Sequence, residues 1–161
     1  MKISKLVLSL VILISFAPSL LFAGVFLGAS QGMESTTLEV GILGRRAEQH
    51  LAFSLPTING SVEEYWKAPV LGASVSVRSL RFQPLVLSGG IMSQISWEST
   101  KGYILGLGGA LALSYEFIGK GGVFFLEGSY LPWVTTQGTL STNLGEKQLK
   151  QYMRLGYRRA F

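Results

Sequence analysis

Cysteine and aspartate are absent from the chain, and His50 is its only histidine. Without cysteine there is no disulfide scaffold, no thiolate metal site and no lipid anchor of the lipoprotein type. With a single imidazole and no aspartate, neighbouring residues do not assemble a zinc-type ligand set. The sequence therefore predicts neither a metal site nor a cofactor.

Charged residues are few, at 14% of the chain, and no second long apolar run follows the N-terminal segment. A soluble domain of this size normally carries more charge on its surface. A transmembrane barrel needs less, because every second residue of its strands faces lipid. The formal charge of +5 includes Lys2 and Lys5, and the remaining cations are scattered along the chain. This scatter argues against a nucleic-acid partner, which requires a continuous basic surface.

The N-terminal segment has the layout of a secretory signal peptide. Lys2 and Lys5 form a basic head, an apolar run extends over Leu6–Phe16, and Ala23 stands at the predicted cleavage point. Residues 1–23 are therefore predicted to be a cleavable signal peptide, and residues 24–161 the mature domain. The alternative is an uncleaved anchor, because the apolar stretch is just long enough to span a bilayer.

Apolar residues alternate with small or polar ones along most of the mature chain, which predicts β-strands. The alternation is clearest where Leu105, Leu107, Leu111 and Leu113 share one face. Eight strands are predicted: Gly24–Gln31, Thr36–Leu43, Gln49–Leu55, Val70–Arg81, Pro84–Trp97, Tyr103–Phe117, Gly122–Leu131 and Lys150–Phe161. In the fourth of them the alternation is lost near Ser79, which predicts a β-bulge.

The two faces of these strands indicate which side meets lipid. One face carries large apolar residues, and the other carries glycine, alanine, serine and a few charges. Small residues suit the narrow lumen of an eight-stranded barrel, whereas they would leave a soluble barrel without a core. The second, fourth and sixth connections are short, whereas 56–69 and 132–149 are long. The predicted fold is all-β: a closed antiparallel eight-stranded transmembrane β-barrel over residues 24–161, preceded by the cleavable signal peptide.

The last strand places Met153, Leu155, Tyr157 and Phe161 on one face, with an aromatic residue at the end. This pattern resembles the terminal strand of bacterial outer-membrane β-barrels, although Arg159 stands where that family usually has an apolar side chain. In architecture the chain is similar to the OmpX, Ail and OmpA-barrel group. The resemblance implies a monomer in the outer membrane of a Gram-negative-type bacterium. It also implies contacts with outer-membrane lipid, lipopolysaccharide and periplasmic chaperones. The four residues would be the assembly signal that the barrel-assembly machinery recognises.

Six charged residues are predicted to point into the barrel, where opposite charges should pair because a lone charge in a narrow lumen is costly. They are Glu39, Glu116, Glu127, Arg78, Arg154 and Arg158. Their positions along the strands place Glu127 beside Arg154 at mid-barrel, and Arg158 and Glu116 near the periplasmic rim. The favoured interpretation is a polar plug that orders the interior, and the alternative is a gate or a narrow ion path.

No catalytic residue is predicted. A hydrolytic triad would need His50, and Ser54 on the same face lies about 13 Å away at about 3.3 Å per residue. Outer-membrane lipid A deacylases carry a His-x-Ser motif, whereas here Ala52 stands two residues after His50. Lipid A palmitoyltransferases use a His and a Ser near the outer leaflet, whereas His50 is predicted near a periplasmic turn.

Function in the group that the chain resembles lies mostly in the outer loops. Here the candidates are Glu63, Glu64, Tyr65 and Trp66 in the third connection, together with the seventh connection. The expected function is non-enzymatic and concerns envelope integrity, adhesion, or interaction with a host or the environment. The alternatives are a narrow pore for small solutes, similar to OmpW, and a lipid A-modifying enzyme.

Overall fold

The computed structural model describes residues 24–32, 35–56, 69–98, 102–117, 119, 121–136, 139–141 and 153–161. These residues form nine strands: β1 Gly24–Gly32, β2 Ser35–Leu43, β3 Ala47–Pro56, β4 Val70–Phe82, β5 Leu85–Glu98, β6 Gly102–Glu116, β7 Gly122–Thr136, β8 Thr139–Ser141 and β9 Met153–Ala160. No helix within this described part is long and apolar enough to cross a bilayer.

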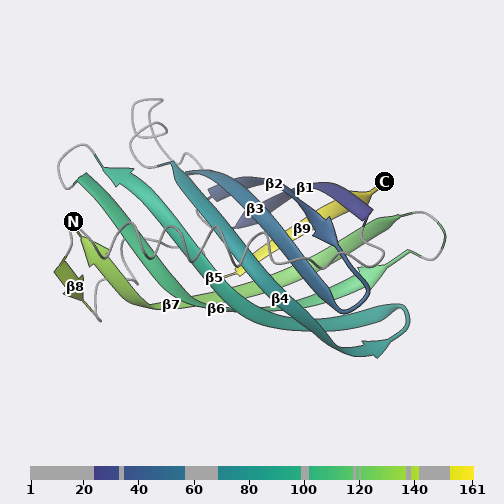
Figure 1. Cartoon of the computed structure of the whole chain (residues 1–161). Coiled ribbons are helices and arrows are strands. Elements are labelled where there is room, and N and C mark those ends of the chain that lie inside the picture. The colour runs from purple at the N-terminus through teal and green to yellow at the C-terminus, as the bar shows by residue number, and fades with distance from the viewer. Residues whose placement is uncertain are drawn as a thin grey trace.

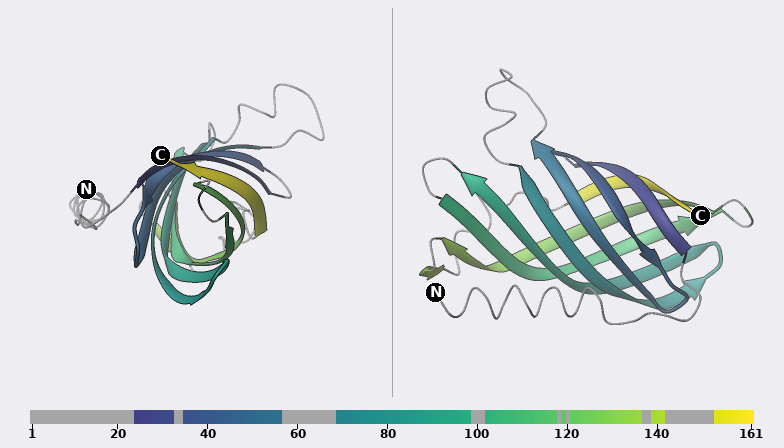
Figure 2. Two further views of the ribbon diagram at one scale, coloured as in Figure 1. Left: turned by 90° about the vertical axis from the view of Figure 1, so that its right-hand side faces the viewer. Right: turned by 45° about the horizontal axis from the view of Figure 1, so that its top comes forward.

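The sheet closes on itself and forms a barrel. Strands β1 to β7 pair antiparallel in chain order, and β9 pairs antiparallel with both β7 and β1. Strand β8 pairs only with the last residues of β7, beyond the part of β7 that pairs with β9, and does not take part in closing the ring. The view along the barrel in Figure 2 shows the closed wall, and Figure 1 shows the tilted strands. The predicted all-β fold and its closed antiparallel eight-stranded barrel are confirmed.

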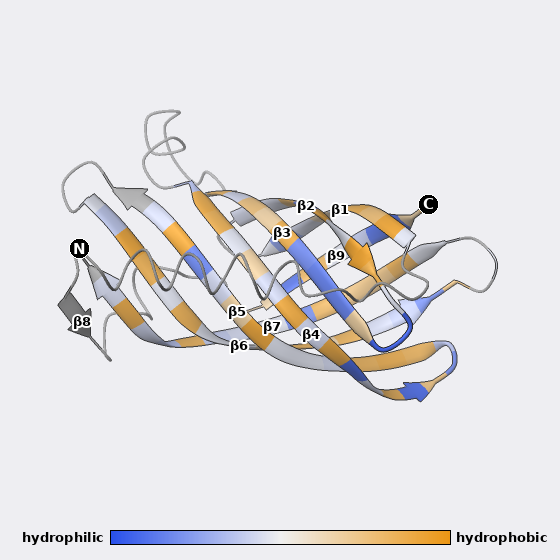
Figure 3. Cartoon of the chain, viewed as in Figure 1, coloured by the Kyte–Doolittle hydropathy of each residue, from blue (hydrophilic) through white to orange (hydrophobic). Residues whose placement is uncertain are grey.

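The strands separate an apolar outer face from a small and polar inner face (Figure 3). On β6, Leu111 and Leu113 are exposed on the outside, whereas Ala112 and Ser114, which alternate with them, are buried. The outward surface of the barrel is thus more apolar than its interior. This distribution is the reverse of that in a soluble barrel.

Most strand bounds lie within a few residues of the predicted ones, and the bulge near Ser79 is confirmed by a register shift between Arg78 and Leu80. The largest difference is in β7, which continues to Thr136 rather than ending at Leu131. A second register shift, between Leu107 and Gly109 on β6, accommodates the extra residue on β7. The short strand β8 was not predicted.

The turns 44–46, 83–84 and 117–121 lie at the same end of the barrel as Gly24 and Phe161, which we call the short-turn end (Figure 1). The 117–121 turn contains Gly119 and Gly121 at φ of 77° and 62°, a conformation that favours glycine. The connections 33–34, 57–68, 99–101 and 137–152 join strands at the opposite end, which we call the long-connection end.

The strands are strongly tilted, and this tilt decides which inward side chains meet. Starting at Val123 and following paired residues once around the barrel leads back to β7 at Val134, eleven residues farther along. Such a stagger requires strands that cross the barrel axis obliquely. Residues in one pairing row therefore lie at different depths, and neighbours across the lumen come from different rows.

Candidate functional site

The interior of the barrel contains a network of buried ion pairs near its middle. Arg158 contacts Glu39, with 2.7 Å between Nε and Oε2, and it also contacts Glu48, while its Nη2 lies 3.6 Å from Oε2 of Glu127. Arg154 contacts Glu39 at 2.6 Å and Glu127 at 2.7 Å. All five side chains are buried. Two guanidinium groups thus bind three carboxylates, and Glu39 and Glu127 each contact both arginines.

Aromatic rings hold the guanidinium of Arg158 from two sides. Its Cζ atom lies 3.8 Å from the ring centroid of Phe125 and 5.1 Å from that of Phe26. Both rings are buried in the lumen. A cation against a ring face is attracted by the π electrons, and the attraction increases when water is excluded. The rings therefore stabilise the charge and fix the position of Arg158 among its carboxylate partners.

Gly28 makes room for this arrangement. It pairs with Arg158 on one side and with Glu39 on the other. A Cβ atom at Gly28 would lie 2.8 Å from Cγ of Arg158 and 3.0 Å from the carbonyl oxygen of Tyr157. The arginine side chain therefore crosses directly over β1 to reach Glu39 on β2.

We expect Gly28→Ala to lower the free energy of unfolding by about 1–3 kcal/mol, because the methyl group overpacks the path of Arg158. The measurement is a urea titration of the detergent-solubilised barrel. Gly72→Ala is the matched control, since a Cβ there has its nearest neighbour at an ordinary 3.6 Å. Equal effects of the two substitutions would contradict the proposed role of Gly28.

A second ion pair lies nearer the short-turn end. Arg78 on β4 pairs with Glu116 on β6, and its Nη1 donates to the carbonyl oxygen of Gly44 at 2.9 Å. Arg78 is buried, whereas Glu116 is only partly buried. The sequence placed Arg158 and Glu116 together at the rim, but in the structure Arg158 contacts the three carboxylates of the central network, and Glu116 pairs with Arg78. The strand tilt and the gap over Gly28 direct Arg158 away from Glu116.

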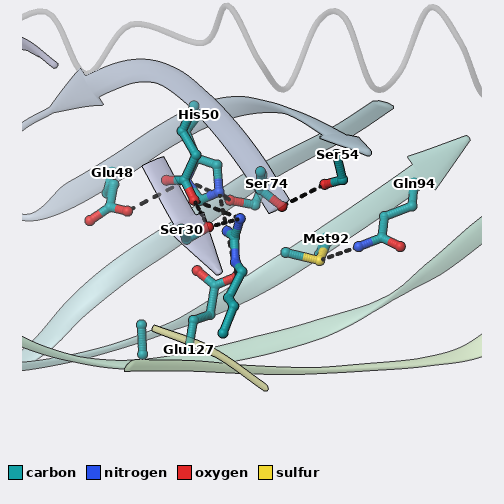
Figure 4. Close-up of polar contacts among 12 residues, drawn as sticks. Ser30, Glu48, His50, Ser54, Ser74, Met92, Gln94 and Glu127 are labelled. Carbon is teal, nitrogen blue, oxygen red and sulfur yellow. Dashed lines mark hydrogen bonds and ion pairs between the residues drawn. The ribbon is translucent and has the colours of Figure 1, made fainter. Parts of the chain in front are cut away.

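The structure adds Glu48 and His50 to the predicted network. Nδ1 of His50 lies 3.5 Å from Oε1 of Glu48, and Nε2 lies 3.1 Å from Nη2 of Arg154. A guanidinium has no acceptor, so Nε2 accepts this hydrogen bond and Nδ1 carries the proton toward Glu48. Figure 4 shows Glu48, His50 and Ser74 close together. Starting the third strand at Ala47 in the sequence would have placed Glu48 on the inward face with His50.

The Ser74–His50–Glu48 cluster has the composition of a hydrolytic triad but not its alignment. Oγ of Ser74 lies 3.1 Å from both ring nitrogens, which places it beside the carbon between them. The Nε2 lone pair is directed at Arg154, and all three cluster residues are buried. Ser54, the serine considered from the sequence, is hydrogen-bonded to Thr37 at 2.8 Å. A nucleophile needs a base aligned with its hydroxyl, so this cluster supports the network rather than catalysis.

An apolar layer fills another part of the lumen. Met92, Ile104, Leu131 and Val134 form a buried cluster, against which Val70 and Ala110 pack. Leu131 points inward after the exposed Tyr130, and the bulge between β6 and β7 then leaves Trp133 exposed outside and Val134 inside. Gln94 follows Met92 on the same face and donates to its sulfur at 3.4 Å (Figure 4). The described lumen thus contains a layer of ion pairs and a layer of apolar side chains.

The residues of the predicted assembly signal lie outside the lumen. Met153, Leu155, Tyr157 and Phe161 are exposed on the outward face of the terminal strand. Glu63, Glu64, Tyr65 and Trp66 fall outside the described residues. Within the described ranges, no group of three or more histidine, cysteine or acidic side chains is arranged to hold a metal ion.

Comparison with known proteins gives no relative: no family model matches the chain, and no curated protein matches it.

Proposed function

We propose that this chain is a bacterial outer-membrane β-barrel with a plugged lumen. The observation that carries the proposal is the outward face, where large hydrophobic side chains are exposed on all eight barrel strands. One example from each strand, at least 43% exposed in every case, is given by Leu27, Leu38, Leu51, Leu71, Ile91, Leu111, Phe124 and Leu155. Water-soluble monomers rarely expose apolar patches larger than a few hundred Å². A bilayer is the solvent that such a surface requires.

Aromatic residues at both ends of the barrel support the same proposal. Tyr115, Phe117, Phe124 and Tyr157 follow one another around the short-turn end, with successive ring centroids 5.2, 5.5 and 5.1 Å apart. Tyr103 and Trp133 are exposed toward the long-connection end. Aromatic belts mark the two interfaces of transmembrane barrels. With the signal peptide over residues 1–23, the belts favour export to the outer membrane of a Gram-negative-type bacterium.

In this proposal the barrel is a monomer that contacts outer-membrane lipid and lipopolysaccharide. Its resemblance to the OmpX, Ail and OmpA-barrel group supports assembly by periplasmic chaperones and the barrel-assembly machinery. The function then resides in the connections at the long-connection end, and Glu63, Glu64, Tyr65 and Trp66 are the recognition candidates. The activity is non-enzymatic and concerns envelope integrity, adhesion, or contact with a host or the environment.

Cell fractionation combined with a heat-modifiability gel tests the membrane proposal. We expect the chain in the outer-membrane fraction, with faster migration before boiling than after it, because a folded barrel resists the detergent. A protein recovered in the soluble fraction would contradict the proposal.

We also expect almost no ion conductance from the wild-type protein in planar bilayers. The central ion pairs occupy the lumen, and the apolar layer around Ile104 excludes water from another section of it. Conductance is recorded against a bilayer treated with the same detergent alone. Steady channels would favour the alternative of a narrow pore.

A further inference from the structure

The charged side chains that the structure places in the exposed class are arginines. Arg45, Arg46, Arg81 and Arg159 are the charged residues in the exposed class, and all four lie toward the short-turn end. In Figure 3, hydrophilic segments lie at the turn between β2 and β3, at the end of β4 and near the C-terminus. Four described glutamates are already paired within the barrel: Glu39, Glu48 and Glu127 in the central network, and Glu116 with Arg78.

Arg159 has a special position among these cations, because it lies on the outward face of β9. It pairs laterally with Gly122 on β7 and with Leu27 on β1, and Leu27 is 56% exposed. On the same face, Tyr157 precedes it and belongs to the aromatic belt described above, and the exposed Phe161 follows it. On β9, Arg159 therefore lies between two exposed aromatic side chains, at the level of the belt.

We infer that the short-turn rim is a binding surface for the headgroups of anionic phospholipids in the adjacent leaflet, with Arg159, Arg45 and Arg46 as its main donors. The inference rests on the proposed membrane location. A side chain that points outward within an aromatic belt lies at the level of the lipid headgroups. Its aliphatic stem lies along the apolar wall while the guanidinium extends into the headgroup region.

The chemistry of the rim fits a phosphodiester. Guanidinium groups donate two parallel hydrogen bonds to phosphate oxygens, and basic residues near an anionic bilayer add to the attraction. A soluble acidic partner has access to Arg45 and Arg46 in their turn. It has no comparable access to Arg159, which projects from the wall between exposed apolar residues. The position of Arg159 therefore favours lipid over a soluble partner.

Native mass spectrometry of the mature barrel in a nonionic detergent tests this inference. The protein is titrated with phosphatidylglycerol or phosphatidylcholine, and the apparent Kd of the first bound lipid is measured. The test variant is R45Q/R46Q/R159Q, and R45K/R46K/R159K retains the charge. The matched control K101Q/K147Q/K150Q removes three cations from connections at the other end of the barrel.

We expect the wild type to bind phosphatidylglycerol more tightly than phosphatidylcholine. Removing the arginines should weaken phosphatidylglycerol binding by roughly fivefold per arginine, because each basic group near an anionic surface contributes about that factor. The lysine variant should retain most of the preference, the control should match the wild type, and high salt should reduce the preference.

Unchanged phosphatidylglycerol binding by the glutamine variant would overturn the inference. So would a wild type that shows no lipid preference but binds a soluble acidic polymer through the same arginines. In both cases a barrel that still inserts into vesicles leaves the proposed function intact. A wild type that fails to insert would overturn the proposed function and this inference with it.

Discussion

Replacing Arg158 with methionine is expected to lower the free energy of unfolding of the barrel by about 3–5 kcal/mol, because it leaves buried carboxylates without a counter-charge. Arg158 is 1% exposed and contacts Glu39, Glu48 and Glu127. Methionine fills a similar volume between the two rings that hold the guanidinium, so the loss reports mainly on charge. The measurement is a urea titration of the barrel in detergent micelles, followed by tryptophan fluorescence.

A second substitution separates charge from packing in this experiment. Adding Glu39→Gln to Arg158→Met removes one of the stranded carboxylates and should recover part of the lost stability, as coupled residues in one network do. Arg159→Met is the matched control, since it makes the same chemical change one residue along on an exposed side chain. Its effect in detergent should stay within about 0.5 kcal/mol. An Arg158→Met barrel as stable as the control would contradict the network.

The alternation of residue types was sufficient to predict the eight strands of the barrel wall. It is strong on β6, where large exposed residues such as Leu111 and Leu113 alternate with the small buried residues Ala112 and Ser114. It is weak on β1, where Phe26 occupies an inward position that a narrow lumen would usually give to a small residue. The large ring fits because its pairing partner on the adjacent strand β2 is Gly41, at which a Cβ would lie 2.7 Å from the ring. A single strand read by itself does not contain that information.

The central network was predictable in membership but less so in its pairing. The alternation along each strand identifies the inward-pointing charges Glu39, Glu127, Arg154 and Arg158. Glu127 and Arg154 lie opposite each other on the paired strands β7 and β9, so their ion pair was predictable. The contact between Arg158 and Glu39 skips a strand, and it depends on the glycine between them and on the strand tilt. The alternation along one strand shows which face a side chain is on. It shows neither the direction in which a long side chain extends nor the register of the closed barrel.

The length of β7 was mispredicted for a similar reason. Pro132 suggests the end of a strand, because proline lacks the N–H that a sheet ladder requires. The register shift opposite Gly108 absorbs this residue as part of a bulge, and pairing resumes at Trp133. A Cβ at Gly108 would lie 1.9 Å from the carbonyl oxygen of Tyr130, so the bulge depends on a glycine on the neighbouring strand.

Deleting Phe161 is expected to reduce the amount of barrel in the outer membrane severalfold while leaving its synthesis unchanged. In the proposed function, the terminal aromatic is read by the assembly machinery together with Tyr157, Leu155 and Met153. Aromatic anchors in recognition sites commonly contribute about 2 kcal/mol or more, which corresponds to about a thirtyfold loss of affinity. Quantitative immunoblots of total and outer-membrane fractions measure the effect.

The structure explains why such a loss would reflect recognition rather than folding. The side chain of Phe161 is 76% exposed, and the residue is held by one backbone hydrogen bond, from its N–H to the carbonyl oxygen of Val25 at 2.9 Å. Phe161→Ala keeps that bond and should still impair assembly, whereas Phe161→Tyr keeps an aromatic ring and should largely restore it. Phe82→Ala is the matched control, because Phe82 is 71% exposed at the same end of the barrel without being terminal. If the Phe161 deletion reached the outer membrane as well as the Phe82 variant does, the terminal strand would not be the assembly signal.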